Sequence, residues 1–283
     1  MSDFLQSGCE VLAGVTDTPR LDVELLLLKA LGKERSYLYT WPEQLLTDEQ
    51  LVIAKQLLQR RQKGEPVAYI IGRRDFWDFS VEVTSATLIP RPETELLVEL
   101  ALQKYDQEAV LDIADLGTGS GILAIALARE FPDSAVYAVD LSKDAIEVAR
   151  RNSESLQLKN IAFKCGSWLE PFAGKAFDLI VSNPPYIEDT DDHLEQGDVR
   201  FEPRSALVSG GDGLGDIRLI AEQAISHLKF GGVLAVEHGY QQGKAVRDIF
   251  VAVGLEKVET EQDLQGHDRV TVGHRSLSDA SPE

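Results

Sequence analysis

The feature that most constrains the fold is an alternation of apolar runs and helical stretches after residue 110. The runs fall at residues 110–114, 135–139, 161–163, 178–181 and 233–236. Helical stretches follow the first two runs, around residues 122–127 and over residues 143–155. Strands that alternate with helices need right-handed crossovers and form a mostly parallel sheet covered on both faces. We therefore expect a doubly wound α/β domain over residues 111–274, with weaker strands at 257–259 and 269–272 completing its edge.

The first part of the chain has a different, helical pattern. Pro19 suits the first turn of a helix, and Gly32 suits the position just after a helix end because glycine tolerates a left-handed backbone. Thr47 and Gln50 have the spacing of a capping box, and apolar residues follow at three- and four-residue intervals. These patterns predict a small helical domain over residues 1–75.

Residues 76–110 are expected to connect the two domains. Residues 76–83 alternate apolar and polar side chains, which is typical of a half-buried strand or hairpin. A turn with two prolines at residues 89–94 then leads into a helix. At the other end of the chain, residues 275–283 are polar and short, and we expect a disordered tail.

The net charge narrows the range of functions. The chain has 28 basic and 47 acidic side chains, a formal charge of −19, and the acidic excess lies almost wholly after residue 80. Because affinity for a phosphate backbone comes from clustered Lys and Arg, nucleic acid is not expected as the main partner. A basic cluster does occur near the end of the helical domain, and it either docks a substrate or forms a solvated face. Its members are Arg60, Arg61, Lys63, Arg73 and Arg74.

Cysteine usage and the N-terminus indicate an ordinary cytoplasmic protein. Cys9 and Cys165 are far apart, so neither a disulfide nor a metal site is expected, and both are predicted to be reduced, buried thiols. No basic and apolar leader begins the chain, and the longest aliphatic run, residues 25–28, is too short to cross a bilayer. We expect no membrane partner.

A glycine-rich loop follows the first strand of the α/β domain. Residues 115–121 have the sequence Asp-Leu-Gly-Thr-Gly-Ser-Gly, with G-x-G-x-G spacing. A dinucleotide fingerprint needs its third glycine one position later, where Ile122 stands, so a pyrophosphate is disfavoured. A cofactor with nucleoside and amino-acid ends but no phosphates fits better, which indicates S-adenosylmethionine. The expected cofactor contacts are Gly117, Thr118, Gly119, Ser120 and Gly121.

Two later residues extend this cofactor hypothesis. Asp140 ends the second strand, 19 residues after Gly121, where a carboxylate can accept hydrogen bonds from ribose hydroxyls. Trp168 follows the third strand and is expected to lie against the adenine ring, with the Ser167 hydroxyl beside it. Each feature alone is common in proteins, and their ordered succession carries the inference.

The fourth strand runs directly into Asn183, Pro184, Pro185 and Tyr186. Tandem prolines make a stiff turn without amide hydrogens, which leaves carbonyl oxygens and the Asn183 side chain to face a ligand. Such a site can accept two hydrogen bonds from a planar NH2 group while Tyr186 stacks on its plane. Because the lone pair of an amide or aryl amine is delocalised, acceptors at Asn183 and the Pro184 carbonyl would favour methyl transfer to that nitrogen. Asn183 is therefore the candidate catalytic residue.

The whole set of motifs resembles the release-factor glutamine methyltransferases (PrmC, also called HemK). The likeness rests on residues 115–121, Asp140, Asn-Pro-Pro-Tyr-Ile at 183–187, Gly-Asp-Val-Arg-Phe-Glu-Pro at 197–203 and Ile-Pro-Arg-Pro-Glu-Thr-Glu at 89–95. It covers nearly the whole chain. It implies a Rossmann-like S-adenosylmethionine-dependent methyltransferase domain with a small N-terminal helical domain. Substrate docking by that helical domain is a separate hypothesis, based on its distinct composition and its basic cluster.

The resemblance also implies a substrate and a set of site residues. Enzymes of this family methylate the side-chain amide nitrogen (N5) of the glutamine in the GGQ motif of class I peptide-chain release factors, in translation termination. It implies that residues 117–121, Asp140 and Trp168 hold the cofactor, that Asn183 approaches it, and that residues 183–186 hold the glutamine. Arg91, Glu93 and Glu202 either line the substrate pocket or form a structural salt-bridge set. Ser167 departs from the family, where an aspartate commonly precedes the tryptophan.

Two alternatives remain open. A nucleic-acid adenine N6-methyltransferase would present the same NH2 geometry to residues 183–186, but it must also hold and flip a base out of a polyanion. The acidic α/β domain disfavours this. The other alternative is a non-catalytic scaffold that binds release factors or ribosomes, and the intact glycine loop beside intact residues 183–186 disfavours it.

Overall fold

The computed structural model describes residues 1–277, and the chain forms two compact units. The first contains Met1–Arg73 together with Asp192–Glu202, a segment that comes far later in the sequence. The second contains Arg74–Asp191 and the chain from Pro203 onward. In the described part of the chain, no helix is long and apolar enough to cross a membrane.

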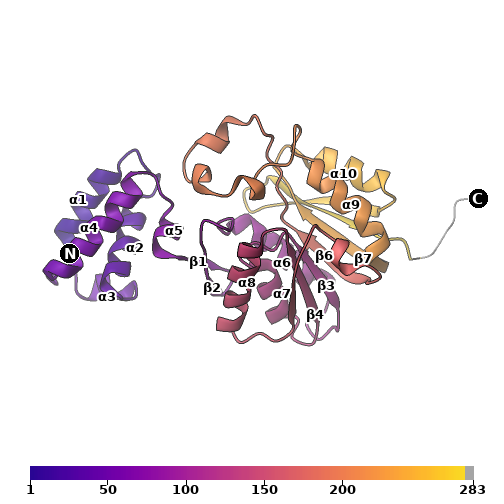
Figure 1. Ribbon diagram of the computed structural model, residues 1–283, viewed down its shortest axis with the longest axis horizontal. Helices are drawn as coiled ribbons and strands as arrows, with labels where there is room; N and C mark the ends of the chain where they lie inside the picture. Colours follow the sequence, from indigo (N-terminus) through magenta and orange to yellow (C-terminus); the bar gives the residue numbers. More distant parts are fainter. Residues whose placement is uncertain (278–283) are drawn as a thin grey trace, which may run out of the picture. The chain divides into compact units, whose positions relative to one another are not determined.

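The N-terminal unit is a helical bundle, as predicted (Figure 1). Its helices are α1 (Ser2–Leu12), α2 (Pro19–Leu31), α3 (Ser36–Thr40), α4 (Asp48–Gln62) and α5 (Val67–Ile71). Pro19 opens α2, and Gly32 ends it with a left-handed φ of 61°. Thr47 and Gln50 form the capping box of α4. The core lies between α1, α2 and α4, around Val23 and Leu27.

One member of the predicted basic cluster is buried inside this unit. The side chain of Arg61 is only 5% exposed and pairs with Asp22 and Asp198, each at 2.7 Å. Asp198 belongs to the segment Asp192–Glu202, which this pair therefore ties to the bundle. A buried guanidinium held by two carboxylates is neither part of a solvated face nor a free docking group, so the prediction was wrong for Arg61.

The second unit begins with a hairpin of β1 (Arg73–Phe76) and β2 (Phe79–Glu82), which confirms the alternating pattern as a hairpin. The turn η1 (Pro92–Thr94) then leads into α6 (Glu95–Lys104). Asn152 fixes the hairpin against the glycine loop. Its Oδ1 accepts from the Glu82 amide at 2.7 Å, and its Nδ2 donates to the Glu82 and Ser120 carbonyls at 3.0 and 2.9 Å.

The main sheet of the described residues has seven strands in the order β5-β4-β3-β6-β7-β9-β8. Its strands are β3 (Asp112–Leu116), β4 (Ala135–Asp140), β5 (Ile161–Cys165), β6 (Phe177–Ser182), β7 (Leu228–Glu237), β8 (Glu256–Gln262) and β9 (Asp268–His274). The strands from β3 to β7 pair in parallel, and β9 is antiparallel to both β7 and β8. The doubly wound fold and its two edge strands are therefore confirmed.

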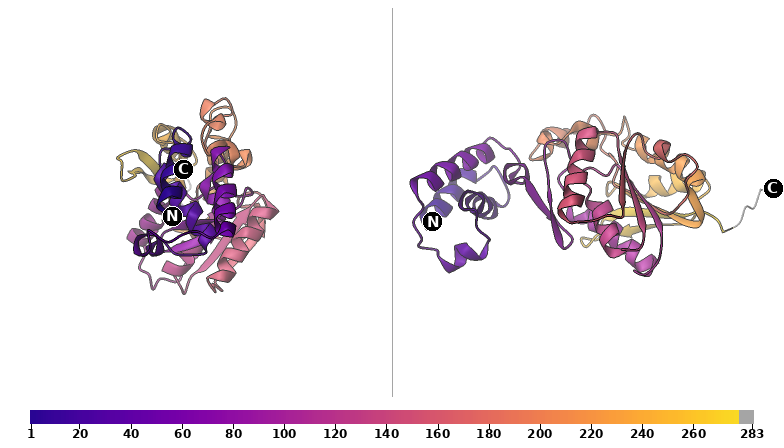
Figure 2. Two further views of the ribbon diagram at one scale, coloured as in Figure 1. Left: turned by 90° about the vertical axis from the view of Figure 1, so that its left-hand side faces the viewer. Right: turned by 60° about the horizontal axis from the view of Figure 1, so that its bottom comes forward.

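The helices of this unit cover both faces of the sheet (Figures 1 and 2). On one face lie α6, α7 (Ile122–Glu130) and α8 (Lys143–Ser155). On the other lie α9 (Gly215–His227) and α10 (Gly243–Ala252), two helices that the sequence patterns did not reveal. Ala114, Ile180 and Leu234 are paired across three strands and pack in the core cluster with α9 and α10.

Some predicted details differ from the structure. Val110 is 76% exposed and precedes β3, because the strand begins at Asp112. Cys165 is exposed rather than buried, since it ends the edge strand β5. The predicted disordered tail falls mostly on residues 278–283, which lie outside the described residues. Its first residue, Arg275, still donates its backbone amide to the Gly232 carbonyl at 2.9 Å.

Candidate active site

A cavity of about 540 Å³ opens at the carboxyl ends of β3, β4 and β6. Both β4 and β6 flank β3, and the chain moves outward through β4 and β5 before returning to β6. This reversal is the topological switch point, where an open α/β sheet binds ligands. Of the predicted site residues, eight line the cavity: Gly117, Thr118, Gly119, Ser120, Asp140, Trp168, Asn183 and Pro185.

The glycine loop forms one wall because its backbone turns tightly after β3. Gly117 and Gly119 have left-handed φ angles of 74° and 55°. The amides of Gly117 and Thr118 both donate to the Val139 carbonyl at 2.9 Å, which fastens the loop to β4. A Cβ added at Gly119 would meet no protein atom within 4 Å, so the bare backbone leaves its space to a ligand.

Gly121 has a different position from the other two glycines. It is the N-cap residue of α7, with a φ of 88°, and a Cβ there would lie 3.0 Å from the Ala149 Cβ. Among the described residues that line the cavity, Gly121 is absent. Its glycine identity is therefore explained by the close approach of α7 and α8.

Asp115 fixes the glycine loop through hydrogen bonds to its carboxylate. Its Oδ2 accepts from the Thr118 hydroxyl at 2.6 Å and from the Ala124 amide at 3.1 Å. Its Oδ1 has no hydrogen-bond partner among the residues that the structure describes. Complete burial raises the pKa of Asp115 to about 7, although the two hydrogen bonds to Oδ2 act in the opposite direction.

Asp140 lies at the end of β4 and faces the same cavity. Its Oδ2 accepts from the Gly119 amide at 2.9 Å, and its Oδ1 accepts from the Ser142 amide at 2.8 Å. Burial raises the pKa of Asp140, and the backbone hydrogen bonds lower it. Because a carboxylate offers about four acceptor positions, each oxygen retains a lone pair for a ligand hydroxyl.

Trp168 forms another part of the wall, next to Gly166 and Ser167. Its φ of 43° is left-handed, a conformation that costs a residue with a large side chain about 1–3 kcal/mol. The indole lies over the glycine loop, since a Cβ at Gly117 would be 3.3 Å from the ring. Gly117 therefore allows the ring and the loop to approach each other.

Asn183 continues from β6 and is held by a hydrogen-bond chain. Its Nδ2 donates to the Thr94 hydroxyl oxygen at 3.0 Å, and that hydroxyl donates to Glu237 Oε2 at 2.7 Å. Burial raises the pKa of Glu237 to about 7, while Thr94 and Arg269 act in the opposite direction. The hydrogen bond to Thr94 engages the amide nitrogen of Asn183, which leaves Oδ1 of Asn183 as an acceptor for a ligand.

The other residues of this motif lie in different surroundings. Pro185 lines the cavity, whereas Pro184 and Tyr186 are not among its lining residues in the described chain. The Tyr186 carbonyl accepts from Gln242 Nε2 at 3.0 Å, which fixes the end of the turn. Burial raises the pKa of Tyr186, so the phenol stays protonated.

Sequence reasoning missed Thr94 and Glu237. Thr94 lies in the turn η1, beside Arg91, and both line the cavity. Glu237 is the last residue of β7 and is 1% exposed. The rule that ligands bind beyond the carboxyl ends of parallel strands could have drawn attention to Glu237, since this residue directly follows the predicted strand at 233–236. Glu93 and Glu202 are not among the described lining residues.

Comparisons with known proteins agree with this site. Residues 3–72 match the PrmC N-terminal domain, and residues 107–271 match a methyltransferase domain. A release factor glutamine methyltransferase from Vibrio cholerae is 52% identical over 261 residues, 91% of this chain and 90% of the relative. The chain belongs to the release factor glutamine methyltransferase family. A family member from Xylella fastidiosa is 50% identical, covering 95% of this chain and 98% of its own.

The fold of this chain is also similar to that of a solved methyltransferase structure. A methyltransferase from Pyrococcus furiosus superposes with a TM-score of 0.54 at 17% identity, over 78% of this chain and 99% of that one. As a release factor glutamine methyltransferase by family, the chain is an enzyme that uses S-adenosylmethionine. The site fits this cofactor, because the bare backbone at Gly119 leaves space for a ligand and Asp140 offers acceptors to hydroxyls.

Proposed function

We propose that this chain methylates the side-chain amide nitrogen (N5) of the glutamine in the GGQ motif of class I release factors. The observation that carries the proposal is the direction of the Asn183 amide. Its Nδ2 is engaged by Thr94, so Oδ1 is the atom offered at a cavity that the glycine loop also lines. An acceptor in this position suits a substrate that presents an NH2 group.

Asp140 and Trp168 would hold the adenosine part of S-adenosylmethionine, and Gly117, Thr118, Gly119 and Ser120 would hold the rest of it. Support for this assignment is that all of these residues line one cavity. Two charge-assisted hydrogen bonds from ribose hydroxyls to Asp140 would contribute about 1.5–3 kcal/mol each. When bound, the cofactor supplies a methyl group made electrophilic by a sulfonium.

The reaction requires positioning more than proton abstraction. An amide nitrogen is a weak nucleophile because its lone pair is delocalised into the carbonyl. Asn183 Oδ1 would accept one of its N–H bonds, and the Pro184 carbonyl is the second acceptor that we propose, although Pro184 is not among the described residues that line the cavity. Together the two acceptors would fix the direction of the lone pair. The same acceptors stabilise the positive charge that develops on nitrogen as it gains the methyl group. The nitrogen would then release one proton, to solvent or to a nearby carboxylate, and return to a neutral amide.

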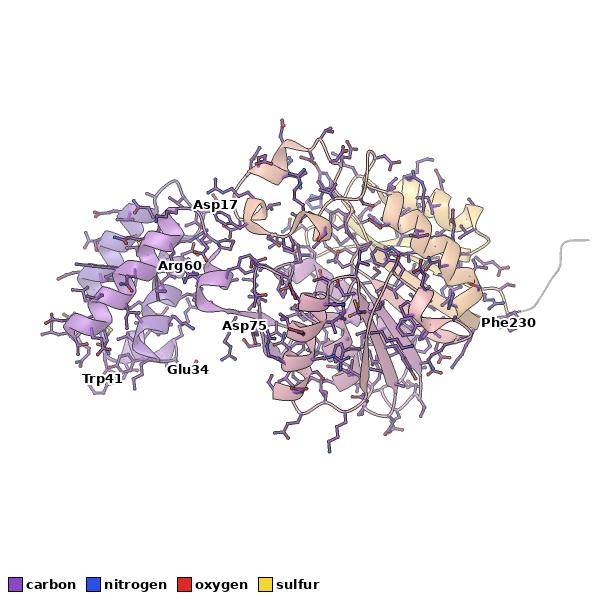
Figure 3. The ribbon with its side chains drawn as sticks, in the orientation of Figure 1. Asp17, Glu34, Trp41, Arg60, Asp75 and Phe230 are labelled. Atoms are coloured by element: carbon purple, nitrogen blue, oxygen red, sulfur yellow. The ribbon has the colours of Figure 1, made fainter. Side chains whose placement is uncertain are left out.

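The N-terminal unit is proposed to dock the release factor. Three large apolar side chains within residues 39–45 are exposed: Tyr39 at 64%, Trp41 at 57% and Leu45 at 81%. Figure 3 shows Trp41 on the surface of this unit. Exposed apolar patches are characteristic of protein-binding surfaces, and these three side chains lie within seven residues of one another in the sequence. We also infer a cytoplasmic location and no nucleic-acid substrate, which the release-factor assignment and the charge of −19 support.

The decisive experiment is methylation with labelled S-adenosylmethionine, followed by peptide mapping. We expect label on the GGQ glutamine of a class I release factor and none on DNA. Label on DNA alone would instead identify an adenine N6-methyltransferase. An absence of label on both would favour a scaffold.

Docking is tested separately with Trp41→Ala. The variant should raise the KM for the whole release factor and leave the turnover of a short GGQ peptide unchanged. An unchanged KM for the whole factor would remove Trp41 from the docking surface.

A further inference from the structure

We propose that Thr94 and Glu237 are positioning residues that fix the Asn183 amide with its oxygen toward the substrate NH2 group. This inference rests on the proposed function, since it concerns how the same site recognises the glutamine amide. Neither residue belongs to the Asn-Pro-Pro-Tyr motif. They lie in the turn η1 and at the end of β7, so three separate parts of the chain converge on one amide.

The direction of both hydrogen bonds depends on one hydrogen atom, that of the Thr94 hydroxyl. The Thr94 hydroxyl has a single proton and lies 2.7 Å from Glu237 Oε2 and 3.0 Å from the Asn183 amide. An ionised carboxylate can only accept, so Thr94 must donate to Glu237. The Thr94 oxygen can then only accept from Asn183. This forces the NH2 end of Asn183 toward Thr94 and leaves Oδ1 for the ligand.

If the two hydrogen bonds between Glu237, Thr94 and Asn183 ran in the opposite direction, Asn183 would present its NH2 group to the substrate instead of its oxygen. If Glu237 is protonated, it can donate to Thr94, and the Thr94 hydroxyl can then donate to Asn183 Oδ1. The Asn183 amide would turn, and its NH2 would face the NH2 of the substrate. Two donors that face each other cannot form a hydrogen bond, so this arrangement would not hold the glutamine for transfer.

The surroundings of Glu237 make its ionisation sensitive to pH. The carboxyl is 1% exposed, and burial raises its pKa to about 7. The charged and titratable groups that act on it come from several elements: Arg91 just before η1, Glu93 within η1, Tyr186 after β6, and Arg269 on β9. The two arginines favour the carboxylate and Glu93 opposes it. Turnover should therefore rise as pH increases through about 7, as Glu237 ionises.

The test compares Thr94→Val, Thr94→Ser and Glu237→Gln in the whole protein with release factor as substrate. Thr94→Val removes the hydroxyl while it preserves the shape, so kcat should fall about 10- to 100-fold, in line with the loss of a preorganised polar group. The cofactor Kd should stay within about 3-fold, because Thr94 touches Asn183 rather than the loop. Thr94→Ser should restore kcat, and Glu237→Gln should abolish the rise of kcat with pH.

A merely structural role would give a different pattern. Ser134→Ala is the matched control, since it also removes a buried hydroxyl with two hydrogen bonds, to the Leu111 amide and the Ala109 carbonyl, each at 2.9 Å. It should lower the Tm without changing kcat. The proposal is overturned if Thr94→Val keeps kcat within about 2-fold, if Thr94→Ser does not rescue, or if Glu237→Gln keeps the wild-type pH profile. If the wild-type enzyme does not methylate release factor, the proposed function fails instead.

Discussion

Asp140 gives the most direct test of the cofactor site. The carboxylate already accepts two backbone amides, from Gly119 at 2.9 Å and Ser142 at 2.8 Å, and it faces the cavity with acceptor capacity left over. Asp140→Asn keeps the size of the side chain but removes the charge and replaces one acceptor by a donor. One of the two backbone amides and one ligand hydroxyl then lose their acceptor.

The magnitude follows from the loss of one charge-assisted hydrogen bond to the cofactor. Such a bond contributes about 1.5–3 kcal/mol, so the Kd for S-adenosylmethionine should rise about 10- to 150-fold. Because burial raises the pKa of Asp140, wild-type affinity should also weaken as pH falls and the carboxyl becomes protonated. Asp140→Asn should lack that component of the pH dependence.

Isothermal titration with S-adenosylmethionine or its demethylated product measures this change. Asp144→Asn is the matched control. Asp144 is an exposed residue in the first turn of α8, and its substitution changes the net charge by the same amount. It should leave the Kd within about 2-fold. If Asp140→Asn is no weaker than this control, while both remain folded by circular dichroism, then Asp140 does not bind the cofactor hydroxyls.

Three further predictions follow from the same contacts. Asn183→Ala should lower kcat about 100-fold and change the cofactor Kd only a few fold, and an unchanged kcat would remove Asn183 from the mechanism. Asp115→Asn should flatten the pH dependence of stability in urea unfolding. Burial raises the pKa of Asp115 to about 7, so its contribution is present at low pH and on the order of 4 kcal/mol is lost as pH rises from about 4 to 7. Arg61→Met leaves Asp22 buried without its partner and should destabilise the N-terminal unit by about 3–5 kcal/mol, whereas a loss below about 1 kcal/mol would contradict the buried pair.

Local patterns were enough to predict the helical bundle, the parallel sheet and the part of the cavity wall that the glycine loop, Asp140, Trp168 and Asn183 form. Pro19, Gly32 and the capping box at Thr47 act within one or two turns of their own helix, so their effects can be recognised without the tertiary structure. The glycine loop and Asp140 follow strands directly, and strand ends in a parallel sheet meet at one edge. These features were therefore placed correctly, although Gly121, Pro184 and Tyr186 of the same motifs are not among the described residues that line the cavity.

The sequence did not reveal the roles of residues that depend on partners far away in the chain. Arg61 belongs to a run of basic residues in sequence, yet its charge is matched by Asp198, which is 137 residues away. Cys165 follows an apolar pattern, yet it ends an edge strand that exposes it. Thr94 was noticed only as part of a proline-rich motif, because its contact with Glu237 spans 143 residues.

The network around Asn183 shows why a short motif alone does not define this site. An asparagine amide can present either a donor or an acceptor, and the two ends are nearly identical in shape. A site that recognises an NH2 group needs the acceptor, and only a partner of fixed polarity can select it. When Glu237 is ionised, it can only accept a hydrogen bond, so the Thr94 hydroxyl must donate to it. The Thr94 oxygen can then only accept from Asn183, which fixes the orientation of the Asn183 amide. In the arrangement that we propose, the preference of Asn183 for an NH2 group is set by a buried charge at the end of β7, outside the motif itself.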